Sequence, residues 1–419
     1  MSIVMRSLRR FVAFGLTALS ASANGISAAS VIPPPGAPSC AVFPANNVWH
    51  ADVSGLPVHP RNESWLAAMG GPSVRLHPDF GPSGEAQPYG IPYIVVPGWH
   101  SKVTVTFDYA DESDPGPYPF GPDTPIEGGS DRHALMIDRD ACVLYELFAA
   151  DYAPGSSTAG SGAIFDLRSN ALRPAGWTSA DAAGLPIFAG LIRRDEVEAG
   201  LIDHAIRVTA EHTDRRYIWP ARHQAGEADD PNLPPMGARF RLTATFDISG
   251  FLPETQVILR AMKRHGLILA DNGSNWFFGG ASESGWSNDV LDELKSVPSG
   301  AFQAVDTSSL MVSPGSGEAR VRAKARLSVR LVPKTIAEGR VATVRGLLDP
   351  PHSGQRIFLQ RFVQGRWRDV RKRTLSAEGT FTFRVQPASS GSFSYRVRKP
   401  ADADHLTATS RKLVLIVVA

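Results

Sequence analysis

The chain has 419 residues, of which 43% are hydrophobic and 20% are charged, and this balance argues for a folded globular protein and against a disordered one. Its net charge of +2 provides no strong field for nucleic acid, so we expect no nucleic-acid partner. The counts of 38 Gly and 33 Pro predict many turns and few long helices.

Residues 1–28 have the pattern of a secretory signal peptide. A basic start is followed by an apolar core over residues 11–19, which is too short to span a bilayer, and then by small residues up to Ala28. We expect cleavage before Ala29 and a protein that is secreted or held at the cell surface. No membrane insertion is expected after cleavage, and residues 29–39 form a Pro-rich leader.

The two cysteines, Cys40 and Cys142, both follow the signal segment. An even number of cysteines in an exported chain favours a disulfide, which would close a loop of about 100 residues. The alternative is a pair of buried free thiols.

Residues 40–310 read as one β-rich candidate catalytic domain. Short runs of β-branched and aromatic residues, separated by Gly, Pro and Asp, predict strands at 93–96, 103–107, 134–137, 143–148, 205–209, 240–246 and 267–270. Helices are expected from Pro253 to just before Gly266 and over residues 288–295. The fold class predicted is mainly β, a sandwich or jelly roll with two or three helices.

The composition changes after residue 310. Residues 311–323 are expected to form a linker, and residues 324–419 contain short alternating strands at the spacing of a β-sandwich. With Trp367 and the Gly391 to Tyr395 stretch, this part resembles the Ig-like accessory modules of bacterial secreted proteins. A basic group within it is either a cationic patch for an anionic wall polymer or a solvated sheet face: Arg361, Arg366, Arg368, Arg371, Lys372 and Arg373.

Several catalytic signatures do not occur in the sequence. We find no Gly-rich phosphate loop, no His-Glu-x-x-His pair, no Gly-x-Ser-x-Gly elbow and no Cys-His nucleophile arrangement. An active site in this chain is therefore expected to consist of carboxylates, histidines or a metal.

The first candidate pair is His133 and Glu146. His133 precedes one predicted strand and Glu146 lies on the next, so a hairpin would bring them together. A histidine beside a carboxylate can transfer protons near neutral pH. The alternative is that Glu146 is an ordinary solvated strand residue.

A second candidate group begins at His204 and continues at Trp219, Arg222 and His223. Aromatic rings beside Arg and His side chains suit a sugar ligand. The alternative for His204, which has apolar neighbours, is a hydrogen-bonded histidine of the core.

A third candidate group lies around Asp271, after the strand that follows the long helix. Asp271 is either an acid or base or the cap of an Asp-Asn-Gly turn, and Trp276 and Trp286 are candidate stacking platforms. Trp177 is a further candidate for substrate binding, and the alternative for it is a role in local structure. Asp181 is assigned to local structure.

Asp111, Glu112 and Asp114 lie in an acidic loop that offers oxygen ligands for a structural calcium ion. The spacing matches no EF-hand, and a solvated acidic turn is the default interpretation. No other cofactor is expected.

Residues 40–306 resemble a widespread, uncharacterised family of secreted bacterial proteins with some fungal members. The resemblance lies in eight segments: 43–49 (FPANNVW), 56–60 (LPVHP), 131–133 (DRH), 145–146 (YE), 176–186 (GWTSADAAGLP), 203–205 (DHA), 235–239 (PMGAR) and 270–274 (ADNGS). It implies secretion and one large domain of catalytic size, and it brings no established reaction.

Our leading hypothesis is a secreted enzyme that acts on an extracellular or cell-wall polysaccharide. As a glycoside hydrolase it would use Glu146 and Asp271 as its carboxylate pair. As a polysaccharide lyase it would use His133 or His204 as the base, with Arg222 neutralising a uronate. The alternative is a non-catalytic protein of the cell surface that binds wall glycan.

Overall fold

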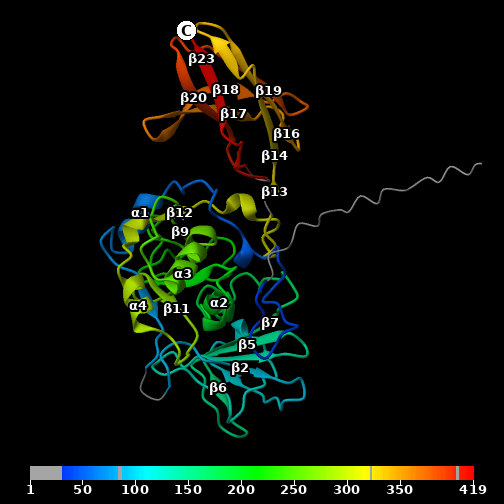
Figure 1. The fold of residues 1–419 in the computed structure, drawn as a ribbon. Helices are drawn as coiled ribbons and strands as arrows, with labels where there is room; N and C mark the ends of the chain where they lie inside the picture. Colours follow the sequence, from blue (N-terminus) through cyan, green and yellow to red (C-terminus); the bar gives the residue numbers. More distant parts are fainter. Residues whose placement is uncertain (1–30, 84–86, 321–322, 403–404) are drawn as a thin grey trace, which may run out of the picture. The chain divides into compact units, whose positions relative to one another are not determined.

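The computed structural model describes residues 31–83, 87–320, 323–402 and 405–419. The predicted signal peptide and the first residues of the predicted leader lie outside this part. The described chain is mainly β, as predicted, with several sheets and few helices (Figure 1).

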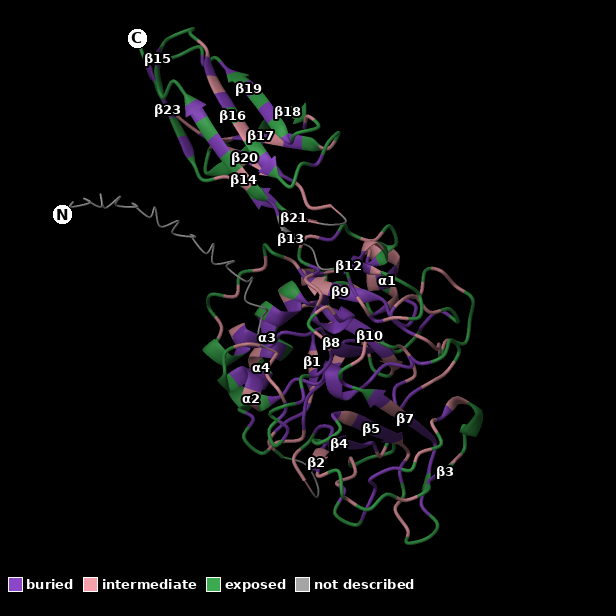
Figure 2. Cartoon of the chain, turned by 90° about the vertical axis from the view of Figure 1, so that its right-hand side faces the viewer, coloured by how far each residue is buried: buried purple, intermediate pink, exposed green. Residues whose placement is uncertain are grey.

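The largest sheet of the first part has six strands and contains both parallel and antiparallel pairs. In spatial order the strands are β1 (His77–Asp79), β11 (Phe277–Gly279), β8 (Ile206–Ala210), β10 (Leu267–Asn272), β9 (Arg239–Leu242) and β12 (Phe302–Val305). β8 and β10 run parallel, and Figure 2 shows them largely buried. Strands buried on both faces lack polar alternation, which is why the sequence pattern does not indicate this topology.

Four α-helices accompany the described strands: α1 (Asn62–Ala68), α2 (Arg194–Glu198), α3 (Pro253–Arg264) and α4 (Asn288–Lys295). α3 and α4 match the two predicted helices, and the apolar stripe of α3 is buried against β9. α1 and α2 were not predicted, because helices of one or two turns leave little periodicity. No described helix has the length and apolar character needed to cross a membrane.

A second sheet carries the candidate hairpin. Its strands are, in order, β2 (Tyr93–Val96), β4 (Ala134–Asp138), β5 (Val143–Phe148) and β7 (Ser161–Asp166), and a small parallel pair consists of β3 (Thr106–Phe107) and β6 (Thr158–Ala159). β4 and β5 form the predicted antiparallel hairpin, with Leu135 opposite Glu146. The predicted disulfide between Cys40 and Cys142 is present, and Cys142 lies in the turn of this hairpin.

The last part of the chain contains two sheets with a core of their own, which includes Val344, Phe383, Val397 and Leu415. One sheet has the order β14 (Arg326–Val332), β16 (Ala342–Asp349), β19 (Thr380–Val385). The other has the order β15 (Thr335–Ala337), β23 (Leu413–Val418), β20 (Gly391–Lys399), β17 (Arg356–Val363), β18 (Arg366–Thr374), and β22 (Ala408–Thr409) pairs with β20. β13 (Ala323–Lys324) pairs with β21 (His405–Leu406). The arrangement is a β-sandwich.

The segment around residues 313–319 has fixed hydrogen-bond partners in the first part of the chain. The Trp219 indole donates to the Ser316 carbonyl at 2.8 Å, and Arg222 donates to the Pro314 carbonyl at 2.6 Å. Gly317 exchanges backbone bonds with Val48 and Asn170. Composition predicts a linker here, but these residues are held along the surface of the first part, because backbone groups and two long side chains supply the partners that composition does not reveal.

Candidate functional site

The site begins at the entry to β4, where His133 meets Glu127. The His133 ring lies 2.5 Å from a Glu127 carboxylate oxygen through Nδ1 and 3.2 Å from the Ala180 carbonyl through Nε2. Both neighbours are acceptors, so both ring nitrogens act as donors when the ring is an imidazolium. Burial by itself disfavours the charged ring, but the bond to Glu127 outweighs it and the pKa of His133 is raised. Both ring nitrogens of this buried histidine therefore face acceptors within the protein, Glu127 and the Ala180 carbonyl.

Glu146, on β5, is fully buried. Its two carboxylate oxygens accept the backbone N–H groups of Ile187 and Phe188, each at 2.9 Å, at the start of the 3₁₀ turn η3 (Phe188–Gly190). Burial raises its pKa to about 7, and the two N–H bonds oppose that rise. Both oxygens therefore have partners in the protein, and Glu146 ties the 181–188 loop to the hairpin. Glu146 is consequently not the exposed partner of Asp271 that the hydrolase hypothesis requires.

Asp181 and Arg207 form a buried, two-point ion pair. Arg207 lies on β8 and donates to both Asp181 oxygens, through Nε at 2.9 Å and through a terminal nitrogen. Both side chains are almost inaccessible to solvent. A guanidinium and a carboxylate in this geometry form a charge-assisted pair in which each side chain is the other's partner inside the protein.

Asp271, on β10, lies beside this pair. One of its oxygens is 3.9 Å from an Arg207 terminal nitrogen, and its side chain is 25% exposed. Burial contributes most to the rise of its pKa, and the nearby Asp181 carboxylate, which also hydrogen-bonds to it, adds to that rise and brings it to about 8. Asp271 is thus a carboxyl group that carries a proton at neutral pH and can still be reached by solvent.

A local irregularity of β10 sets this position. The register between β10 and β8 shifts between Leu269 and Asp271, so Ala270 is left out of the ladder. The Ala270 carbonyl accepts the N–H of Ala183 instead, at 2.8 Å, which seats the 181–184 loop against Asp271. Gly184 has φ +67°, and a Cβ there would lie 2.4 Å from the Trp177 carbonyl, so the loop requires glycine at this point.

Three predicted substrate-binding residues lie along the same loop. His223 Nδ1 is 2.9 Å from the Ala182 carbonyl, and its side chain is 26% exposed. Arg222 hydrogen-bonds to Ala183 through its backbone N–H, while its side chain donates to the Arg173 and Pro314 carbonyls. The half-buried Trp177 ring lies 5.5 Å from the Arg173 guanidinium. The Arg222 side chain is bonded to two backbone carbonyls, so the role in uronate binding given to it by the lyase hypothesis lacks support. His223 and Trp177 are partly exposed.

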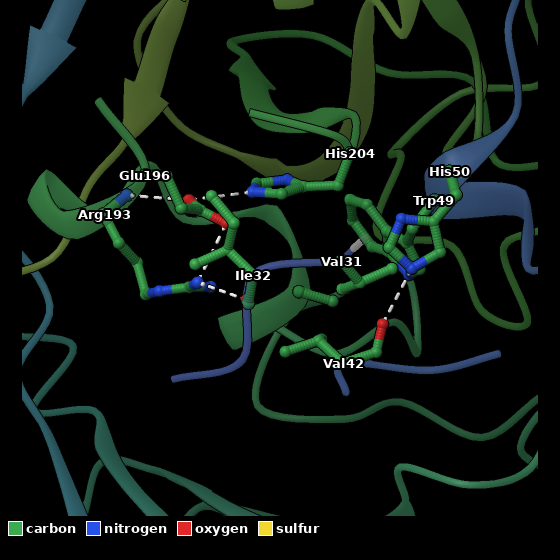
Figure 3. A pocket seen from close by; sticks show the side chains of 9 residues that line it. Val31, Ile32, Val42, Trp49, His50, Arg193, Glu196 and His204 are labelled. Atoms are coloured by element: carbon green, nitrogen blue, oxygen red, sulfur yellow. Dashed lines mark hydrogen bonds and ion pairs between the residues drawn. The ribbon is translucent and has the colours of Figure 1, made fainter. Parts of the chain in front are cut away.

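His204 lies in a different cluster (Figure 3). Its Nε2 is 3.2 Å from Glu196 and its Nδ1 is 2.7 Å from the Ala205 carbonyl. His50, Arg193 and Glu196 line the same pocket, and Arg193 donates to the Ile32 carbonyl at 2.9 Å. The cavity measures about 10 Å³, which is room for about one water molecule and not for a sugar. His204 is therefore a hydrogen-bonded core histidine and not a catalytic base.

Two further predicted ligand-binding rings, Trp276 and Trp219, make contacts within the protein. Trp276 is fully buried, packs against Phe240 and Phe302, and donates its indole N–H to the Met69 carbonyl. Trp219 is half-buried and donates to Ser316. The prediction that Trp276 stacks on a ligand is wrong, because its ring has no accessible face.

The predicted calcium ligands have protein partners. The Asp114 carboxylate contacts Arg173 and accepts the Ile164 N–H, and Glu112 accepts the Thr178 N–H. An arginine against Asp114 supplies the positive charge that a calcium ion would bring, so the geometry favours ion pairing here. Asp111 is exposed in the 3₁₀ turn η2 (Ala110–Glu112).

Among the described residues, ligand atoms of His352, Asp402 and His405 lie within 4.8 Å of one another in the last part of the chain. Lys399 is buried and its ammonium contacts the Asp402 carboxylate. That carboxylate therefore already has a cationic neighbour, which disfavours a metal ion at the same position.

Sequence reasoning missed Asp181, Arg207 and the direct role of Glu127 beside His133. One signal for Arg207 was present, because an arginine stands inside an otherwise apolar run at 205–208. A buried charge requires a partner, but the sequence does not say which of the many carboxylates supplies it.

No family model matches the chain, and no curated protein does. Among solved structures, the chain is similar to the CARDB domain of the PF1109 protein from Pyrococcus furiosus, determined in complex with di-metal ions, with 11% identity over 23% of this chain and 88% of that chain, at a TM-score of 0.16. It is also similar to an engineered protein, with 15% identity over 40% of this chain and 36% of that chain, at a TM-score of 0.18. At these scores neither likeness decides the fold or the function.

Proposed function

We propose that this protein is a secreted enzyme that hydrolyses a glycan, with Asp271 as the proton donor. The observation that carries the proposal is the position of Asp271, a partly exposed carboxyl group beside the buried Asp181–Arg207 pair, where burial and the Asp181 carboxylate raise its pKa to about 8. An acid with a pKa near the working pH is what protonation of a glycosidic oxygen requires.

The reaction would proceed by transfer of the Asp271 proton to the leaving glycosidic oxygen as the bond from that oxygen to the anomeric carbon breaks. A water oxygen then bonds to the anomeric carbon, and the water's proton returns the acid to its starting state. Asp181 and Arg207 act as positioning residues: the fixed negative charge of Asp181 keeps the neighbouring carboxyl protonated, and Arg207 holds Asp181 in place.

Residues along the 181–184 loop support a glycan as the substrate. His223 and Trp177 keep accessible surface beside the 181–184 loop, and a ring with one polar and one apolar face is a suitable partner for such a pair. Four of the segments that carry the family resemblance, 131–133, 145–146, 176–186 and 270–274, contribute His133, Glu146, Asp181 and Asp271 to this cluster.

Export is part of the proposal. The signal-like residues 1–28 and the Cys40–Cys142 disulfide both fit an oxidising environment outside the cytoplasm. Membership of the secreted bacterial family that residues 40–306 resemble is likewise a prediction.

The test is a depolymerisation screen of the mature protein on a broad panel of polysaccharides, read by reducing ends and by absorbance of unsaturated uronates. We expect reducing ends without unsaturated products, and loss of that signal in Asp271→Asn. The matched control is Asp131→Asn, an exposed aspartate in the loop before His133. Unsaturated products would indicate a lyase instead, and equal activity in Asp271→Asn would remove Asp271 from the mechanism.

A further inference from the structure

The outer face of the sheet formed by β20, β17 and β18 combines aromatic rings with cations. Ile357 and Leu359 are fully buried, so Phe358, Gln360 and Phe362, which alternate with them on β17, point to the opposite face. Cross-strand pairing places further side chains on that face, which we call the outer face: Trp367, Asp369 and Lys372 from β18, and Arg396 and Arg398 from β20.

The aromatic part of the outer face is accessible. Phe362 and Trp367 lie opposite each other next to the turn of the β17–β18 hairpin, with ring centroids 5.2 Å apart, and Phe362 is 46% exposed. The Arg396 guanidinium lies 4.5 Å from the centre of the Trp367 ring. Trp367 is half-buried beside the exposed Phe362, and partly exposed aromatic surface that carries a cation often marks a binding site.

A hydrogen-bonded chain holds the charged groups in place. Arg396 donates through Nε to the Gln360 side-chain oxygen at 2.7 Å, and the Gln360 amide donates to Asp369 at 2.7 Å. Asp369 in turn lies 3.5 Å from a terminal nitrogen of Arg398. The two terminal nitrogens of Arg396 have no partner among the described residues, so the guanidinium is oriented and still able to donate.

The charge on the outer face favours an anion. Lys372, Arg396 and Arg398 stand against the single carboxylate of Asp369. Arg361, by contrast, faces the core side, where it covers the Phe393 ring at 4.6 Å, and its paired residue Arg368 shares that side. Of the basic residues grouped by the sequence, only Lys372 therefore belongs to the outer face.

We propose that the outer face binds an acidic polysaccharide, with sugar rings on Trp367 and Phe362 and uronate carboxylates on Arg396 and Arg398. A planar guanidinium matches a carboxylate with two parallel bonds, and an aromatic face matches the apolar face of a sugar ring. Arg396 and Arg398 lie two residues apart on one strand, about 7 Å, so two carboxylates of one extended polymer can be engaged together. The inference rests on this face alone and does not depend on the chemistry of Asp271.

The test is binding of the full mature chain to polygalacturonate, measured by isothermal titration calorimetry and by affinity electrophoresis. We expect binding that weakens as salt rises, no binding to neutral dextran, and a loss of affinity of about tenfold or more in both Trp367→Ala and the Arg396→Ala/Arg398→Ala double variant. The matched control is Arg326→Ala/Arg384→Ala, which removes two exposed arginines from the other sheet of the sandwich and should bind as the wild type does.

Three outcomes would overturn the inference. The first is absence of binding to any uronate polymer by a chain whose thermal unfolding is normal. The second is equal binding in Trp367→Ala together with equal binding to inorganic polyphosphate, which would mean unspecific attraction of anions. The third is an equal loss of affinity in the control variant. Asp271→Asn should bind polygalacturonate like the wild type, so failure of this inference and failure of the proposed activity are distinguishable.

Discussion

Asp181 and Asp271 hydrogen-bond to each other from two separate segments of the chain, and only Asp181 has a guanidinium bound to both of its oxygens. Arg207 reaches Asp271 only at 3.9 Å. Two adjacent carboxyl groups rarely ionise together. Arg207 contacts Asp181 more closely than Asp271, which favours the proton on Asp271. The candidate acid is therefore defined by the position of one arginine.

Activity should fall as pH rises through the pKa of Asp271, which is about 8, because only the protonated form donates. Asp271→Asn should lose about 10²- to 10⁴-fold in kcat, the usual contribution of a general acid. A pH–rate profile on the substrate found by the screen measures both effects. A flat profile across this range would argue against Asp271 as the donor.

The free energy of unfolding should also depend on pH through the titration of Asp271. The pKa of Asp271 is higher in the folded protein than its ordinary value of 3.8, so its stabilising contribution is complete below pH 4 and is lost as pH rises towards 8. The free energy of unfolding of the wild type should therefore fall relative to Asp271→Asn across this window, by no more than about 1.4 kcal/mol per pH unit. Urea unfolding at several pH values measures the difference, and parallel curves would contradict it.

Asp181→Asn should move the alkaline limb of the activity profile to lower pH. Removing the charge of Asp181 removes one cause of the raised pKa of Asp271, so that group loses its proton earlier. A residue with a purely structural role would lower activity without moving the limb.

Breaking the ion pair between Asp181 and Arg207 should be costly, because the remaining charge stays buried without its partner. Arg207→Gln leaves the buried carboxylate of Asp181 without its partner, and we expect a loss of about 3–5 kcal/mol of stability. The Asp181→Asn/Arg207→Gln double variant should recover part of this loss, because no buried charge is then left alone. Denaturant unfolding of the single and double variants measures the coupling, and strict additivity would contradict it.

The Cys40–Cys142 bond should contribute about 4–5 kcal/mol, because the two residues are 102 positions apart and the bond restricts a long loop in the unfolded chain. The Cys40→Ser/Cys142→Ser variant should unfold at a clearly lower temperature than the oxidised wild type. Adding a reductant to the wild type should lower its Tm to a similar value, whereas the variant should not respond.

The segment 313–319 should resist proteolysis in the folded protein. Arg222→Ala removes the donors to Arg173 and Pro314, so cleavage within 313–319 should become faster in this variant. Arg215→Ala, which removes another arginine bonded to a backbone carbonyl, is the matched control. Rapid cleavage of the wild type at this segment would show that these contacts do not hold it.

The sequence allowed prediction of features that depend on local pattern. The hairpin of β4 and β5, the helices α3 and α4 and the strands of the sandwich follow from alternation, capping residues and turn residues. His133 and Glu146 were predicted as a pair and Asp271 as part of a separate group, and in the fold all three lie close enough to Asp181 to feel its charge. The pairing of Cys40 with Cys142 followed from their number alone.

What the sequence did not reveal depends on contacts between distant segments. Arg207 and Asp181 are 26 residues apart, and only the folded sheet shows that they bind each other. Trp276 and Trp177 look alike in the sequence, yet one is in the core and the other is half-buried, because the loops around them differ in packing. The shift of register at Ala270 accompanies a contact with Ala183, 87 residues earlier, that no local pattern encodes.

The 181–188 loop is fastened at one end to Arg207 of the six-stranded sheet and at the other end to Glu146 of the four-stranded sheet. The position of the whole loop therefore depends on both sheets, because its two fixed points lie on different ones. Recovery of activity during refolding would then lag behind the return of secondary structure. An activity assay would thus detect only molecules in which both sheets have folded.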